Sequence, residues 1–276
     1  MKQKIKTNIR KSVGLEKAIL RVLGSAENVF QYTYKSYLDQ KVFKEYCKNR
    51  LEVKQGIFKG MKYPSMEAAG SALGLKLAGM YEEELIPVLE RIMQKGYEKI
   101  IDIGSAEGYY AIGLARAMEE VEVEAYDIDP YARKLLDGMR KINCVDSRVH
   151  INSLCTKETL INMELGKKSL VISDCEGFEK ELFDKESAGA LQSVDILVEV
   201  HDNLEKGEHC IYDQIYEALK DTHNIEEITS ISVAEKICNH SASDLNMILK
   251  TDNEWIAFMK ERAWRMKWLF LQAKSC

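Results

Sequence analysis

The 276-residue sequence has few prolines and no long hydrophobic run. With only 3 Pro and 46% hydrophobic residues, it is neither collagen-like nor a disordered, low-complexity chain. No stretch of about 18 uncharged apolar residues occurs, so we expect no transmembrane segment. Acidic residues outnumber basic ones, 44 to 39, and the net charge of −5 argues against nucleic acid as a partner.

Paired cysteines are also missing. The 7 cysteines are scattered and form no C-x-x-C pair, which argues against a disulfide framework and a zinc knuckle. We therefore expect reduced thiols in a cytoplasmic protein. Residues 1–24 are rich in Lys and Arg, but their apolar runs are too short for a secretory signal. A solvated basic helix is favoured over a membrane-surface helix for this segment.

From residue 99 onward, short apolar runs alternate with helical patterns. The runs cover residues 100–103, 121–126, 148–154, 170–172 and 196–200. Helical patterns follow them at 109–118, 131–142, 157–165, 179–184 and 210–221. Residues 225–233 and 266–271 supply two more strands, separated by a helix near 254–262. This alternation predicts an α/β, Rossmann-like, doubly wound sheet of seven mostly parallel strands, with an antiparallel edge strand.

Residues 1–89 are predicted to form a helical N-terminal extension, and residues 90–276 the α/β domain. Phe30, Tyr34, Tyr37 and Leu38 make one apolar stripe of a helix. Residues 56–64 indicate a short strand or hairpin that turns at Gly60. We expect residues 31–80 to form the roof of a pocket over the sheet.

The strongest motif is a strand, a glycine loop and a helix at residues 101–111. Gly104 lets the backbone approach a ligand, and Gly108 lets the helix start pack closely. Replacing Gly104 by Val is expected to abolish ligand binding without unfolding the protein. Asp102 suits a cationic amine, and the G-x-G-x-x-G of dinucleotide sites is missing. Asp127, at the end of the second strand, is placed to accept both ribose hydroxyls, while Asp129 is expected to cap the next helix.

A ligand with a ribose, an amine and a carboxylate is S-adenosylmethionine. On these residues the sequence resembles the class I S-adenosylmethionine-dependent methyltransferases. Residues 173–179 (Ser-Asp-Cys-Glu-Gly-Phe-Glu) are similar to the D-x-E-G-x-E signature of the FkbM-type family, as is the glycine loop with its following aromatics. The cofactor-binding residues expected on this basis are Tyr81, Asp102, Gly104, Ser105, Ala106, Glu107, Gly108, Tyr109, Asp127, Ile128 and Asp174.

Reactive side chains are expected at the carboxyl ends of the fourth and fifth strands. Asp174 shares a strand face with Glu176, as does Glu199 with His201. One interpretation makes Glu176, His201 and Glu199 catalytic, with His201 or Glu176 as general base. A second has Asp174, Glu199 and His201 hold Mg²⁺ or Mn²⁺. A third is that these side chains only cap helices and loops.

The sequence thus predicts a methyltransferase that acts on oxygen in a small molecule or glycan. Methylation of nitrogen or carbon in a small molecule or peptide, and a non-catalytic cofactor-binding protein, are the alternatives. The N-terminal region is larger than in the FkbM-type family, which leaves the acceptor open. The sequence also leaves homo-oligomerisation open.

Overall fold

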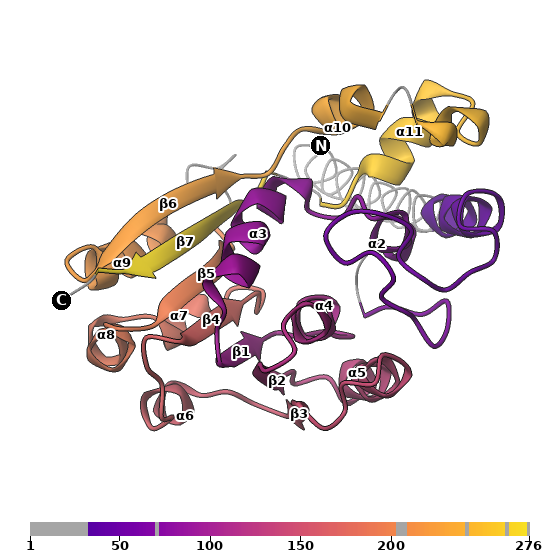
Figure 1. The fold of residues 1–276 in the computed structure, drawn as a ribbon. Coiled ribbons are helices and arrows are strands. Elements are labelled where there is room, and N and C mark those ends of the chain that lie inside the picture. Colours follow the sequence, from indigo (N-terminus) through magenta and orange to yellow (C-terminus); the bar gives the residue numbers. More distant parts are fainter. Residues whose placement is uncertain (1–32, 70–71, 203–208, 241–242, 263–264, 275–276) are drawn as a thin grey trace, which may run out of the picture.

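A seven-stranded sheet forms the centre of the molecule (Figure 1). The computed structural model describes residues 33–69, 72–202, 209–240, 243–262 and 265–274. The strand order is β3-β2-β1-β4-β5-β7-β6. The strands are β1 (Lys99–Ile103), β2 (Glu122–Tyr126), β3 (Val149–Asn152), β4 (Ser169–Ser173), β5 (Asp195–Val200), β6 (His223–Thr229) and β7 (Lys267–Ala273).

The predicted seven-stranded, mostly parallel sheet is confirmed. Strands β1 to β5 pair in parallel, and every residue of β4 and β5 is buried, as expected of strands covered on both faces. The antiparallel strand is β7, which pairs with both β5 and β6. It lies one place in from the edge, and β6 occupies the edge itself.

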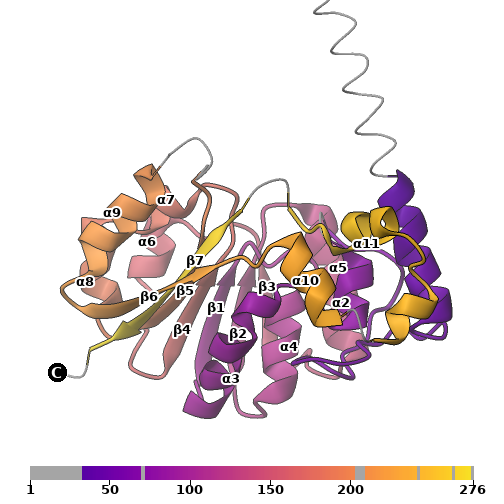
Figure 2. The same cartoon turned by 90° about the horizontal axis from the view of Figure 1, so that it is seen from above.

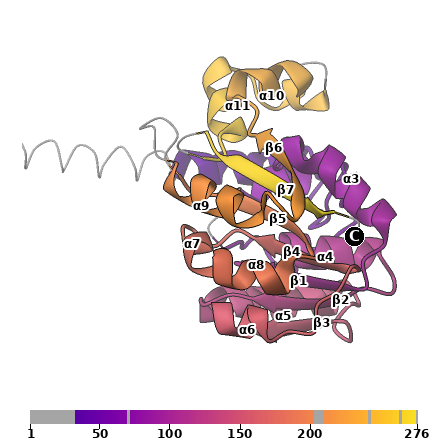
Figure 3. The ribbon, with the colours of Figure 1, turned by 90° about the vertical axis from the view of Figure 1, so that its left-hand side faces the viewer.

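Helices cover both faces of the sheet (Figures 1 and 3). One face carries α3 (Ile86–Lys95), α4 (Tyr109–Ala117) and α5 (Pro130–Ile142). The other carries α6 (Lys157–Ile161), α7 (Glu179–Leu182), α8 (Lys185–Leu191) and α9 (Cys210–Leu219). Two apolar clusters, one on each face, form the core. This layering leaves the carboxyl ends of the parallel strands open, where loops build the site.

The N-terminal region packs beside two helices from the far end of the chain (Figure 2). Residues 33–45 are helical and are followed by α2 (Leu73–Ala78) and the 3-10 turn η1 (Glu83–Leu85). The ammonium of Lys35 caps α11 (Asp252–Met259), 3.0 Å from the carbonyls of Phe258 and Lys260. Leu38 is fully buried, whereas Tyr37 of the same predicted stripe is 56% exposed. Phe30 and the basic segment 1–24 lie outside the described residues.

Several predicted boundaries were wrong, and one helix was missed. The sixth strand ends at Thr229 because a capping box starts α10 (Val233–His240): the Ser232 hydroxyl accepts from the Glu235 N–H, and the Glu235 carboxylate accepts from the Ser232 N–H. The third strand is shorter than predicted, and α8 was not foreseen. Around Gly60, with φ +83°, the chain turns beside one isolated bridge, Glu52 with Lys62.

The predicted division at residue 89 falls inside α3, and residues on both sides of it share one apolar cluster. The division into an extension and a domain stays a prediction. Among the described residues, no helix has the length and apolar character needed to cross a bilayer. The η3 turn (Asp244–Met247) completes the elements between α10 and α11.

Candidate functional site

A cavity of about 790 Å³ opens at the carboxyl ends of the parallel strands. Its walls come from the glycine loop and from the loops after β2, β3, β4 and β5. Residues within two further segments, 68–81 and 261–266, complete the walls. Of the predicted residues it is lined by Tyr81, Gly104, Ser105, Ala106, Tyr109, Asp127, Ile128, Asp174, Glu176, Glu199 and His201. The fold therefore brings most of the predicted site together at the expected edge.

The glycine loop is shaped by contacts within the protein. Gly104 has φ +82°, and a Cβ there would lie 1.8 Å from the carbonyl oxygen of Asp174. The prediction that Gly104→Val spares the fold is therefore wrong, because the side chain would strike backbone before it reached a ligand. At Gly108 a Cβ would lie 2.3 Å from Leu136 Cδ1, so this glycine serves the packing of α4 on α5 and does not line the cavity.

Asp127 joins the second strand to the glycine loop. Its Oδ2 accepts a hydrogen bond of 2.8 Å from the Ala106 N–H, and its Oδ1 accepts one of 2.8 Å from the Asp129 N–H. Ala106 has a positive φ of 49°, a strained conformation for a residue with a side chain. Asp129 caps α5 through the Tyr131 N–H, as predicted. Next to Asp127, the side chain of Ile128 is 75% exposed.

Asp102 and Glu107 are turned away from the cavity. Asp102 is 2% exposed, and its Oδ2 accepts a hydrogen bond of 3.1 Å from the Ala111 N–H at the start of α4. Burial and repulsion from Asp174 raise its pKa to about 7. Glu107 is fully buried and pairs with Lys76 at 2.6 Å. Neither carboxylate lines the cavity, so direct binding of the cofactor by these two residues stays a prediction.

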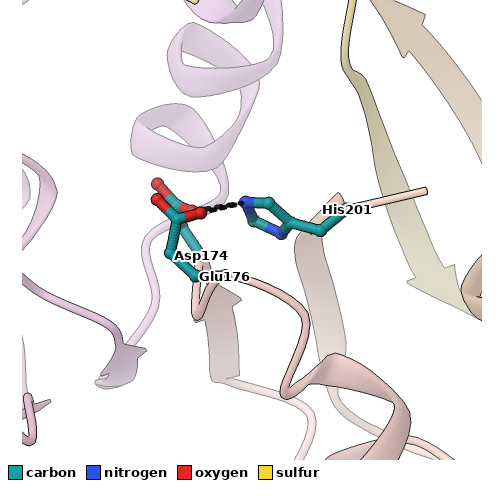
Figure 4. A group of neighbouring side chains, drawn as sticks. All are labelled: Asp174, Glu176 and His201. Atoms are coloured by element: carbon teal, nitrogen blue, oxygen red, sulfur yellow. Dashed lines mark ion pairs between the residues drawn. The ribbon is translucent and has the colours of Figure 1, made fainter. Parts of the chain in front are cut away.

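Four carboxylates lie close to the ring nitrogens of His201, and Figure 4 shows two of them, Asp174 and Glu176. Its Nδ1 lies 2.7 Å from Oε1 of the fully buried Glu179. Its Nε2 faces three more carboxylates, at 3.4 Å from Asp174, 3.6 Å from Glu176 and 3.3 Å from Glu199. The predicted convergence of β4 and β5 side chains is thus present, with Glu179 as an additional member.

These carboxylates set the charge of His201. Burial alone would lower the pKa of the imidazole, but its hydrogen bonds to Glu179 and Glu199 outweigh burial and raise the pKa to about 11. Burial and repulsion from Asp174 raise the pKa of Glu199 well above its usual range. A general base must start neutral, so the charge of this ring opposes the predicted role of His201 as base.

Glu199 is also engaged by a residue that the sequence did not single out. Arg262, which follows α11, pairs with Glu199 and with the buried Glu82. The side chains with the spacing of a metal site among the described residues are Asp174, Glu176 and His201, whose ligand atoms all lie within 4.8 Å of one another. In this set Glu176 stands where the prediction had Glu199.

Sequence reasoning missed several residues of the site. The cavity walls include Lys76 from α2, and Glu261, Arg262 and Met266 from the segment before β7. None of them belongs to a local motif, so no signal in the sequence pointed to them. Glu179, by contrast, is the last acid of the D-x-E-G-x-E pattern, and that position was a usable signal.

No protein-family model and no curated protein matches the sequence. Solved structures with a similar fold include three described as O-methyltransferases. A Klebsiella pneumoniae protein provisionally described as an O-methyltransferase is 12% identical with a TM-score of 0.48, covering 86% of this chain and 90% of that one. A Bacillus cereus O-methyltransferase in complex with SAH is 10% identical with a TM-score of 0.46, covering 68% and 80%. The O-methyltransferase TomG from Streptomyces achromogenes, in complex with SAM, is 12% identical with a TM-score of 0.45, covering 68% and 78%.

At these identities and TM-scores, the similarity says nothing about the activity of this chain. The strand order defines a Rossmann-like, doubly wound α/β protein. Its cavity lies where ligands bind in that class, outside the carboxyl ends of the strands.

Proposed function

We propose that this protein is an S-adenosylmethionine-dependent methyltransferase that acts on oxygen in a small molecule or glycan. The observation that carries the proposal is that one cavity contains both Asp127, beside the glycine loop, and the cluster of carboxylates around His201. The first feature suits a nucleoside and the second suits a hydroxyl acceptor.

Asp127 and the apolar side chains near it suit the nucleoside. Each Asp127 oxygen accepts one backbone N–H, and a carboxylate has about four acceptor positions, so both ribose hydroxyls can still donate to it. Ile128 is 75% exposed and Leu154 is 49% exposed, and both line the cavity. Exposed apolar side chains at a cavity mouth suit the faces of a flat ring such as adenine.

The charge of the cavity suits a cationic ligand. Six acidic side chains line it, against the basic residues Lys76, Arg262 and His201. S-adenosylmethionine, when bound, supplies a methyl group on a positively charged sulfonium. The protein has to hold the acceptor oxygen in line with that methyl group and take its proton.

Glu176 is the better candidate for the proton acceptor. Its carboxylate is 90% exposed and lines the cavity. The imidazole of His201, by contrast, is already protonated on both nitrogens and cannot accept another proton. Glu176 also has a positive φ of 54°, and such strain recurs at functional sites. The D-x-E-G-x-E pattern then has a physical reading, which supports membership of the FkbM-type family: Asp174 and Glu176 face Nε2 of His201, and Glu179 holds Nδ1.

A divalent cation is the alternative way to handle the acceptor proton. Asp174, Glu176 and His201 offer two carboxylates and an imidazole, a donor set that Mn²⁺ or Mg²⁺ accepts. A carboxylate behind the imidazole, as Glu179 is here, is common behind metal-bound histidines. The residues therefore fit such an ion, which would lower the pKa of a bound hydroxyl.

Calorimetry with S-adenosylmethionine tests the cofactor, with NAD as the negative control. Asp127→Ala should weaken binding about 5- to 150-fold, because the ribose loses its acceptor. Asp184→Ala is the matched control: it also removes an aspartate that caps a helix, α8, but it lies outside the cavity wall and should leave the affinity near that of wild type. If wild-type protein does not bind S-adenosylmethionine, the proposal is refuted.

Chelation distinguishes the two versions of the chemistry once an acceptor is found among hydroxylated small molecules. Activity that is lost with a chelator and restored by Mg²⁺ or Mn²⁺ supports the metal. If the chelator has no effect, Glu176→Gln should lower turnover about 100-fold or more, as expected on losing a general base.

Free thiols at the six cysteines of the described residues agree with the cytoplasmic location that we also propose.

A further inference from the structure

Phe178 is an exposed aromatic residue in the wall of the cavity. It belongs to the loop between β4 and α7 and is 37% exposed. Its backbone is held in place, because the Phe178 N–H donates to the Cys175 carbonyl at 3.2 Å and its carbonyl accepts from the Glu181 N–H at 2.9 Å. The side chain takes no part in these bonds. A ligand that covers the ring removes apolar surface from water, which favours binding.

The strand order separates Phe178 from the nucleoside end of the cavity. Ile128 follows β2 and Leu154 follows β3, and β1 with the glycine loop lies between these strands and β4. Neighbouring strands lie about 4.8 Å apart, so the end of β4 is about 10 Å from that of β2 and about 14 Å from that of β3. A nucleoside bound at Asp127 therefore leaves the Phe178 ring uncovered.

The space beside Phe178 adjoins the proposed proton acceptor. Glu176 lies two residues earlier in the same loop, with its carboxylate 90% exposed. A Cβ at Gly177, between the two, would meet nothing within 4 Å, so the tip of the loop has open space beside it. Met266, which precedes β7, adds an apolar side chain to the cavity wall on the side away from the nucleoside. A ligand in this space can contact an aromatic ring and a carboxylate of one loop.

We propose that a ring of the methyl acceptor packs on Phe178, with a hydroxyl of that ring directed toward Glu176. This inference rests on the proposed function and restricts the acceptor to hydroxylated rings with an apolar face. The face of an aromatic ring and the C–H face of a sugar ring are both apolar, so either can cover the Phe178 ring. Phe178 thus determines the specificity for the acceptor and has no part in binding the cofactor.

The first test measures methyl transfer, as release of S-adenosylhomocysteine, to three panels of acceptors: phenols, methyl glycosides and open-chain diols. For the best phenol or glycoside, kcat/KM should exceed that of the best diol by about tenfold or more, because only a ring covers Phe178. The phenol and glycoside panels distinguish the two kinds of ring.

The second test uses the best ring acceptor. Phe178→Ala should raise its KM about tenfold or more with little change in kcat, and Phe178→Tyr should keep a KM near that of wild type because the ring remains. The affinity of Phe178→Ala for S-adenosylmethionine, measured by calorimetry, should stay within about twofold of wild type. Tyr216→Ala is the matched control: Tyr216 is 38% exposed on α9, outside the cavity wall, and its loss should leave KM unchanged.

Three results overturn the inference and leave the proposed function standing. They are a protein that binds S-adenosylmethionine but methylates diols as well as rings, one that methylates none of the panels, and a Phe178→Ala variant with the wild-type KM. A Phe178→Ala variant that loses affinity for the cofactor and for the acceptor alike also contradicts the assignment to the acceptor. Wild-type protein that does not bind S-adenosylmethionine overturns both the inference and the proposed function.

Discussion

At the scale of single residues, glycine is required for two different reasons. At some positions a Cβ would clash with the backbone, and at others only the positive φ disfavours a side chain. Gly104 and Gly177 both have a positive φ, +82° and +98°. A Cβ at Gly104 would lie 1.8 Å from a backbone oxygen, while a Cβ at Gly177 would meet nothing within 4 Å. The two positions therefore separate the cost of conformation from the cost of a clash.

Alanine at each position should show this difference in urea unfolding. Gly177→Ala should lower the free energy of unfolding by about 1–2 kcal/mol, the cost of a left-handed conformation. Gly104→Ala should cost about 2–5 kcal/mol, because overpacking against the backbone adds to that strain. Equal losses at both sites would show that the chain relaxes around the Gly104 side chain.

Asp102 should make stability depend on pH. Burial and repulsion from Asp174 raise its pKa from 3.8 to about 7 in the folded protein. The folded state therefore binds this proton more tightly than the unfolded state, so the contribution of Asp102 to stability falls as the pH rises from about 4 to 7. Asp102→Asn keeps an acceptor for the Ala111 N–H and removes the charge.

Thermal melts of wild type and Asp102→Asn between pH 4 and 8 check this expectation. The melting temperature of the variant should increase relative to that of wild type as the pH rises, with most of the increase complete near pH 7. A constant difference in melting temperature across that range would mean that Asp102 does not titrate there.

At the scale of elements, the segment around Phe58 packs on the outer face of α4. Phe58 is 2% exposed, and its ring lies edge-on to Tyr109, with centroids 5.1 Å apart. A Cβ at Gly113 would lie 2.6 Å from the Phe58 ring, so the helix has a glycine where the ring rests. Because Tyr109 also lines the cavity, this packing supports the site.

Phe58→Ala should lower the free energy of unfolding by about 3–5 kcal/mol, the range for deleting a buried aromatic side chain. It should also weaken cofactor binding, since the wall at Tyr109 loses its support. Met247→Ala is the control: Met247 is 67% exposed, and the change should stay within about 0.5 kcal/mol. Denaturant titration with calorimetry measures both effects, and an F58A protein as stable as wild type would show that the segment does not stabilise α4.

At the scale of the whole molecule, the N-terminal region shares an apolar cluster with the sheet and its helices. Leu38, Val42 and Phe58 belong to the same apolar cluster as residues of β1, β2 and α4. Lys35 and Lys41 tie residues 33–45 to α11, through its terminal carbonyls and through Glu254. Lys76, from the same region, lines the cavity.

A fragment of residues 90–276 should therefore fail to fold by itself. It begins inside α3 and exposes the face of α4 that Phe58 covers. Far-ultraviolet circular dichroism and urea titration, with the full chain measured in parallel, should show loss of the cooperative transition. A fragment that unfolds cooperatively would identify residues 90–276 as an independent domain.

The fold followed from the sequence because its signals are local. Apolar runs of strand length, each followed by a helical pattern, dictate a parallel sheet, and the order of the strands then brings the ends of β4 and β5 together. Asp127, Asp129 and the D-x-E-G-x-E acids could be found for the same reason, since each lies at a fixed distance from a strand end. The boundary of β6 was missed because a capping box, not hydrophobicity, ends that segment.

The sequence by itself thus determined the class of fold and the edge of the sheet where the site lies. The tertiary structure decided which side chains reach the cavity: Asp102 and Glu107 turn inward to Ala111 and Lys76, while Lys76 and Arg262 enter from segments far away in the chain. It also decided the charge of His201, because a pKa depends on every carboxylate within a few ångströms of the ring. Those distances are set by packing between elements, which no local pattern records.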